Sequence, residues 1–201
     1  MNMCMPANRY LLPLLMMITS AVLFQPAAKE VQPIAIDPTV SSFDSIQAGR
    51  NSHFYCIESV EDTVQKRATE GIVGYTRVRR KKMAPIISAP LPPLAVKQSL
   101  EALLKDKQFD AASAEEAEFH IKIRVFEFSL KEVSDKLPQN MEAKIALELI
   151  IIDNNDKTPA GKFVIRSQNS KSAVDTSKYA EEIMRGALES ALAEIFQILS
   201  R

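Results

Sequence analysis

Hydrophobic and polar positions alternate along two long segments in the middle of the chain, which is the pattern of half-buried β-strands. In the first segment, 119–130, the apolar positions begin as Phe119, Ile121, Ile123 and Val125 and then slip by one to Phe126, Phe128 and Leu130. A one-residue slip is what a β-bulge produces, so we expect a bulge near Val125 and Phe126. In the second segment, 142–152, one face carries Ala143, Ile145, Leu147, Leu149 and Ile151.

Shorter apolar runs predict further strands over 53–60, 71–75 and 162–168. The stretch 154–159 has strong turn chemistry, so the strands on either side of it and the strand over 119–130 are expected to form an antiparallel meander. Ile34 and Ile36 alternate with polar or small residues and could add a short edge strand.

Two segments repeat their apolar residues at helical spacing instead. The first helix is expected over 92–107, where Pro92 and Pro93 suit the first turn. The second is the last element of the chain, with Ser177 as its N-cap. Its apolar stripe consists of Ala180, Ile183, Met184, Ala187, Leu188, Ala191, Leu192, Ile195 and Leu199. The predicted fold is α+β, with an antiparallel sheet of four to five strands packed against two amphipathic helices in two layers.

The first thirty residues have the order of a secretory signal peptide, with a basic start, an apolar run over 10–24 and small residues at Ala27 and Ala28. The run is shorter than the roughly 20 residues that span a bilayer, which favours a cleaved signal over an uncleaved anchor. We therefore divide the chain into a signal peptide (or anchor) over 1–28, an extended linker over 29–50 and a single domain over 51–201. The domain is expected to be exported to the periplasm, and to be membrane-associated if the signal is not cut.

The net charge limits the kinds of partner that the chain can bind, and the cysteine content limits the disulfides that it can form. Twenty-five basic and 25 acidic side chains leave no net charge, which argues against nucleic acid as a partner. Removal of the signal would leave Cys56 as the one cysteine, so an internal disulfide is excluded. Cys56 is interpreted as a small buried hydrophobe, with an intermolecular disulfide as the alternative.

No pattern of catalytic chemistry is present. His53 and His120 are the only histidines, and neither has a metal-ligand or nucleophile partner at a recognisable spacing. Both are interpreted as solvated strand residues. We therefore predict no catalytic, cofactor-binding or metal-binding residues, no cofactor and no enzymatic activity.

One local feature suggests a contact site. Between 77 and 82, five of six residues are basic, namely Arg77, Arg79, Arg80, Lys81 and Lys82. Such a run could meet anionic lipid headgroups, at roughly 1 kcal/mol per charge near the surface. The alternative is a solvated loop whose charges pair with Glu70 and other acids.

The element order also resembles a known family. A Pro-rich lead, a strand near 55, the helix sequence over 94–104, the alternating strand over 118–123 and the strand over 143–149 are followed by a short strand and a final amphipathic helix. This order is similar to that of the YajG-type envelope lipoproteins of Gram-negative bacteria, over roughly 50–200. Those proteins are acylated on a cysteine directly after the signal, which this chain lacks. The family has no established enzymatic activity, so the resemblance assigns no catalytic residue.

The resemblance and the basic run together imply a non-enzymatic accessory protein of the envelope, binding an envelope protein or an anionic lipid surface. The alternative is a subunit of a multiprotein envelope assembly or transport complex, and a hydrolase using His53 or His120 is the least favoured interpretation. The oligomeric state is left open.

Overall fold

A computed structural model describes residues 33–44, 46, 53–77, 83–133, 139–173 and 179–201. The chain divides into two compact units, Met1–Glu30 and Val31–Arg201. All described residues belong to the second unit, so the signal peptide predicted over 1–28 lies outside them.

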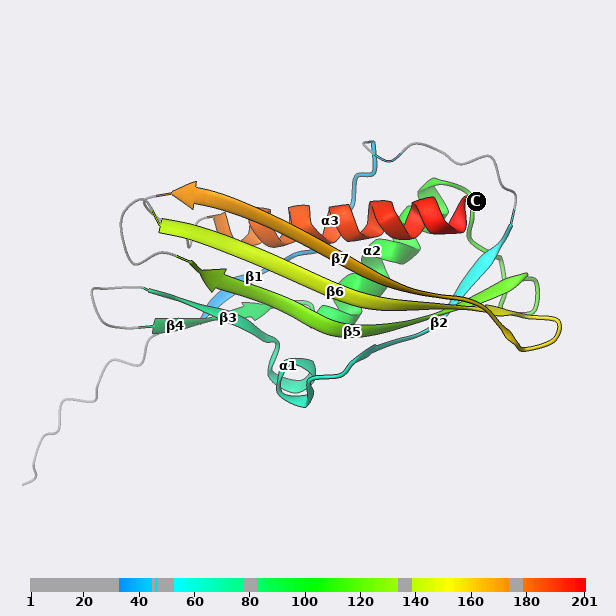
Figure 1. Cartoon of the computed structure of the whole chain (residues 1–201), viewed down its shortest axis with the longest axis horizontal. Helices are drawn as coiled ribbons and strands as arrows, with labels where there is room; N and C mark the ends of the chain where they lie inside the picture. The colour runs from blue at the N-terminus through cyan, green and yellow to red at the C-terminus, as the bar shows by residue number, and fades with distance from the viewer. Residues whose placement is uncertain (1–32, 45, 47–52, 78–82, 134–138, 174–178) are drawn as a thin grey trace, which may run out of the picture. The chain divides into compact units, whose positions relative to one another are not determined.

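Seven strands and three helices make up the described unit (Figure 1). The strands are β1 (Ile34–Ile36), β2 (Tyr55–Asp62), β3 (Ile72–Arg77), β4 (Met83–Ser88), β5 (Phe119–Glu132), β6 (Gln139–Asp153) and β7 (Pro159–Ala173). The helices are α1 (Gln65–Glu70), α2 (Pro92–Asp106) and α3 (Ala180–Leu199). The helix predicted over 92–107 is therefore confirmed to within one residue, and β7 is longer than the strand predicted over 162–168.

The strands form one mixed sheet in the order β1-β4-β3-β5-β6-β7, with β2 also paired to β5. The meander β5–β6–β7 is antiparallel, as predicted. The expectation of an antiparallel sheet of four to five strands was wrong, because β1 pairs with β4, and β2 and β3 pair with β5, in parallel. Parallel neighbours need a long crossover, and the connection through β4 and α2 supplies one before β5.

β2 and β3 lie one after the other along a single edge of β5. β2 pairs with the first half of β5, from Phe119 to Val125, and β3 joins it at Leu130. The partner of β5 changes from β2 to β3 at the predicted bulge, which is located by the shift of the β5–β6 register between Val125 and Glu127. Phe126, the extra residue, is 44% exposed, so its assignment to the apolar set was wrong, while Phe128 and Leu130 are buried. A bulge leaves one residue out of the ladder, which frees Phe126 to turn outward.

α1 closes the gap that the bulge leaves between β2 and β3. Arg67 is buried and binds Asp62 through Nε–Oδ2 and Nη2–Oδ1 contacts of 2.6 Å each. Its Nη2 also donates to the carbonyl oxygens of Val125 and Phe126, at 3.2 and 3.1 Å. The Arg67 guanidinium thus binds both carbonyls at the bulge, and the Val125 oxygen also accepts a hydrogen bond from the Thr63 N–H, at 3.1 Å.

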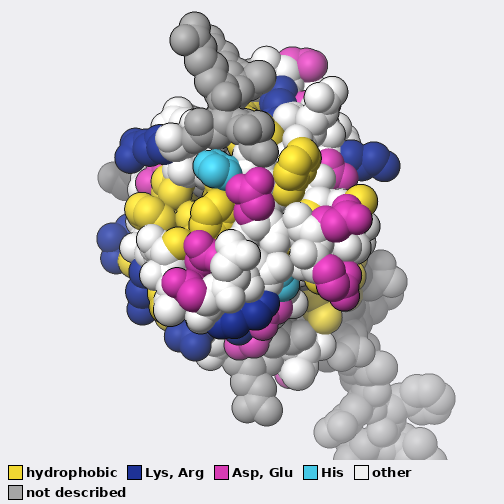
Figure 2. Space-filling model, turned by 90° about the vertical axis from the view of Figure 1, so that its right-hand side faces the viewer, with side chains coloured by type: hydrophobic (Ala, Val, Ile, Leu, Met, Phe, Trp, Pro, Cys, Tyr) yellow, Lys and Arg dark blue, Asp and Glu magenta, His cyan; other side chains and the backbone are white. Residues whose placement is uncertain are grey.

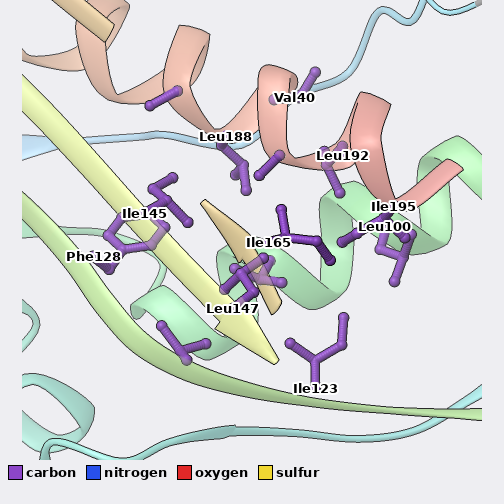
Figure 3. Close-up of a cluster of buried hydrophobic side chains, with 14 of the residues drawn as sticks. Val40, Leu100, Ile123, Phe128, Ile145, Leu147, Ile165, Leu188, Leu192 and Ile195 are labelled. Atoms are coloured by element: carbon purple, nitrogen blue, oxygen red, sulfur yellow. The ribbon is translucent and has the colours of Figure 1, made fainter. Parts of the chain in front are cut away.

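The core lies between one face of the sheet and the two long helices (Figure 3). Ile123 and Phe128 of β5, Ile145 and Leu147 of β6 and Ile165 of β7 form the sheet side of the labelled cluster. Leu100 of α2 and Leu188, Leu192 and Ile195 of α3 close it from above. The predicted apolar stripe of α3 is fully buried, which confirms it as core.

Within the predicted linker over 29–50, Ile34–Ile36 form the edge strand β1, which confirms the short strand expected there. The expectation of an extended linker does not hold for Val40, Phe43 and Ile46, which are buried in the same core as the helices. The Val40 N–H donates to Ser99 Oγ on α2, at 2.9 Å. Prolines and serines suggested a linker, but the apolar residues between them supply enough surface to anchor this segment.

Candidate functional site

The predicted contact run lies at the hairpin formed by β3 and β4. Arg77 is the last residue of β3 and pairs with Met83, the first residue of β4. Arg79, Arg80, Lys81 and Lys82 belong to the connection 78–82 and lie outside the described residues. The structure therefore places the first residue of the basic run, Arg77, beside Met83, the residue that follows the run.

Exposed apolar side chains flank these two ends. Tyr75 is 46% exposed and Met83 is 48% exposed. Thr76, between Tyr75 and Arg77, is buried, and its two neighbours in the strand face the opposite side of the sheet. The hairpin thus presents an aromatic ring and a thioether on the same face as Arg77. This pair was missed from the sequence, although the alternation Tyr75-Thr76-Arg77 carries the signal.

The base of the hairpin is held firmly against β5. Glu132 Oε1 accepts hydrogen bonds from Thr76 Oγ1 at 2.7 Å and from the Arg77 N–H at 3.0 Å. Gly74 lies opposite Leu130, and a Cβ at Gly74 would come within 2.1 Å of the Leu130 oxygen. Only glycine permits this approach. A shallow groove follows the junction, lined by residues 73–75, 77, 83 and 129–132.

The two histidines are engaged in local contacts. His53 Nδ1 lies 2.5 Å from Glu118 Oε2, and its ring meets Phe119 edge-on at 5.4 Å between centroids. His120 Nε2 lies 3.2 Å from the Ala114 oxygen, and its Nδ1 is 3.8 Å from a Glu58 carboxylate oxygen. Figure 2 shows histidine, acidic and hydrophobic side chains interspersed on one face of the molecule. His120 is thus a partly exposed strand residue of β5, as expected, whereas His53 is exposed and lies just before β2, outside the strand predicted to begin with it.

Cys56 lies opposite His120 in the β2–β5 register and is partly buried. It was expected to be a small buried hydrophobe, and its burial is only intermediate. Among the described residues no group of three or more His, Cys, Asp or Glu side chains could hold a metal ion.

The open face of the sheet is organised by ion pairs. Glu148, which is buried, lies between Arg124 and Lys162, at 3.4 and 2.8 Å. Glu58 similarly contacts Lys122 at 2.7 Å. Rows of alternating charge across neighbouring strands stabilise a solvated sheet face, and they leave this face with mixed charge.

Comparison with known proteins places the fold. No family model and no curated protein matches the chain. Among solved structures it is similar to protein XCC0632 from Xanthomonas campestris, of the family DUF330, with a TM-score of 0.58 and 15% identity over 83% of this chain and 91% of that chain. A candidate lipoprotein from Caulobacter crescentus gives 0.40 and 14% over 54% and 77%, and a minor lipoprotein from Acinetobacter baumannii gives 0.39 and 10% over 52% and 82%.

The chain is thus a two-layer α+β domain with the fold of XCC0632. At this identity the likeness concerns the fold alone. None of the helices in the described ranges is long and apolar enough to cross a membrane.

Proposed function

We propose that this chain is a non-enzymatic accessory protein of the bacterial envelope, related to the YajG-type lipoproteins, which contacts an anionic lipid surface through its β3–β4 hairpin. The observation that carries the proposal is the exposure of Tyr75 and Met83 at the two ends of the basic run. Export is supported by the order of the first thirty residues.

The hairpin combines the two interactions that bring a protein to an anionic membrane. Each Lys or Arg near such a surface contributes about 1 kcal/mol. Tyrosine suits the interfacial region, because its ring is apolar and its hydroxyl remains hydrated. The bonds from Glu132 to the hairpin base hold Tyr75 and Arg77 in place, so little conformational entropy is lost on contact.

The absence of enzymatic activity is part of this proposal. It is supported by the sequence, in which neither His53 nor His120 has a nucleophile or metal-ligand partner at a recognisable spacing. The alternative is that the chain is a subunit of an envelope assembly or transport complex. The apolar stripe of α3 cannot be the interface of such a subunit, because that stripe is buried in the domain itself.

Co-sedimentation with vesicles tests the lipid contact. We expect the protein to bind vesicles that contain phosphatidylglycerol and to bind phosphatidylcholine vesicles far more weakly. The double variant Arg80→Glu, Lys81→Glu should lower the affinity at least tenfold, because each reversal replaces an attraction of about 1 kcal/mol by a repulsion.

The matched control is Lys97→Glu, Lys105→Glu, which makes the same charge change on exposed positions of α2. Equal affinity of the hairpin variant and the control variant would contradict the proposed contact. Binding to both kinds of vesicle with equal strength would contradict its electrostatic basis.

A further inference from the structure

The edge strand β7 offers backbone groups to a further strand. β7 runs over 15 residues, Pro159–Ala173, and pairs with β6 along its length. Of the described strands, none pairs with its other edge. The backbone N–H and C=O groups along such an edge can pair with an added strand. Figure 1 shows α3 running alongside β7.

A groove lies beside Phe163 of β7, on the helix side of the strand. Its other lining residues come from one stripe of α3 at helical spacing, Ser190, Ala193, Glu194, Gln197 and Ile198, and from Arg201 just after the helix. Phe163, Ala193 and Ile198 are only partly buried and give the groove an apolar floor. Side chains of an added strand alternate between its two faces, so those that lie beside Phe163 on the helix side would enter this groove.

The charge of β7 selects the kind of strand that can be added. Its sequence contains three basic residues, Lys162, Arg166 and Lys171, and no acidic residue. Lys162 pairs with Glu148 and Lys171 pairs with Glu182. Arg166 is exposed and forms no ion pair with any described residue. A second copy of β7 would bring the same positive charges to this edge, whereas an acidic strand would complement Arg166.

We propose that β7 and α3 form a docking site for an extended acidic segment of another protein, which adds to the sheet as a strand. Acidic side chains of that segment face Arg166 on the open side of the sheet. Apolar side chains, at alternate positions, enter the groove above Phe163. This inference is independent of the lipid contact at the β3–β4 hairpin, which uses different strands.

The test uses a labelled ten-residue peptide that alternates Glu and Val, titrated into the full chain at low salt and followed by fluorescence anisotropy. A second peptide with Lys in place of Glu is the matched probe. We expect the Glu peptide to bind at least tenfold more tightly than the Lys peptide. Hydrogen exchange with the Glu peptide bound should slow for amides of β7.

Arg166→Glu should weaken binding of the Glu peptide at least tenfold, while Lys105→Glu, the same charge change on α2, should leave it unchanged. Equal binding of the two peptides, no binding of either, or protection confined to strands other than β7 would overturn the proposal. A dimer of the peptide-free protein that protects β7 would also overturn it, because a second copy would then be the occupant.

Discussion

The burial of individual polar side chains explains much of how this domain holds together. Tyr55 is 5% exposed, and its hydroxyl donates to the Leu199 carbonyl at the end of α3, at 2.8 Å. Its ring stacks on Phe119 and Phe109. Burial, with a smaller contribution from the negative charge of Glu118, raises the pKa of the Tyr55 phenol to about 12. The first residue of β2 is thereby tied to the last helix.

This raised pKa predicts a loss of stability at alkaline pH. Unfolded chains begin to release the Tyr55 proton near pH 10, while the folded chain holds it to about 12. The unfolded state therefore binds fewer protons between these values, and the free energy of unfolding falls as the pH rises through this window. Urea denaturation from pH 8 to pH 12 measures it.

The comparison is with Tyr55→Phe, which lacks the titrating group. At pH 8 the variant should be less stable by about 1 kcal/mol, because the hydrogen bond to Leu199 is lost. The difference should shrink above pH 10. A constant difference between the two proteins across the whole range would show that Tyr55 does not titrate as described.

At the scale of elements, the bulge in β5 and the helix α1 act together. β2 leaves the edge of β5 where the bulge begins, and Arg67 reaches back from α1 to the carbonyls of Val125 and Phe126. Its charge is balanced by Asp62, whose side chain is 0% exposed. The buried ion pair thus anchors α1 to β5 at the bulge, where β2 ends.

Arg67→Ala should therefore destabilise the domain strongly, although Arg67 belongs to the short helix α1. It leaves the Asp62 carboxylate buried without its partner, which typically costs about 3–5 kcal/mol. Lys97→Ala, which removes one member of an exposed pair with Glu101, should cost less than about 0.5 kcal/mol. Urea denaturation of both variants measures the difference. Similar losses would mean that Asp62 is hydrated after all.

The sequence predicted the elements better than their pairing. The phase slip located the bulge, because a buried face constrains every side chain of β5 and β6. The direction of neighbouring strands has no such signature, since alternation looks the same in parallel and antiparallel strands. The basic run was found from its charge, but the exposure of Tyr75 and Met83 depends on which face the helices cover, which is a tertiary property.

At the scale of the whole molecule, the segment before β2 is part of the domain. Arg185 of α3 donates to the carbonyl oxygens of Asp37 and Thr39, at 3.1 Å each. Lys107, just after α2, donates to the Phe43 oxygen at 3.1 Å. These bonds and the buried side chains between them fasten residues 37–46 across both helices.

Phe43→Ala tests this boundary. Phe43 is 3% exposed, so its truncation should lower the free energy of unfolding by about 3–5 kcal/mol. Phe126→Ala makes the same change at a 44% exposed position and should cost less than about 1 kcal/mol. Chemical denaturation of the two variants gives the comparison. Equal, small losses would return residues 37–46 to the role of a linker.

β5 pairs with β2 and β3 on one edge and with β6 on the other. This arrangement affects the order in which the strands can pair during folding. Tyr55 of β2 pairs with Phe119 of β5, which is synthesised 64 positions later. The β6–β7 hairpin, by contrast, closes between Ile152 and Pro159. Short-range closures lose less chain entropy and form sooner. During synthesis, β2 is therefore made long before β5, and it cannot form its strand pairing until β5 is available.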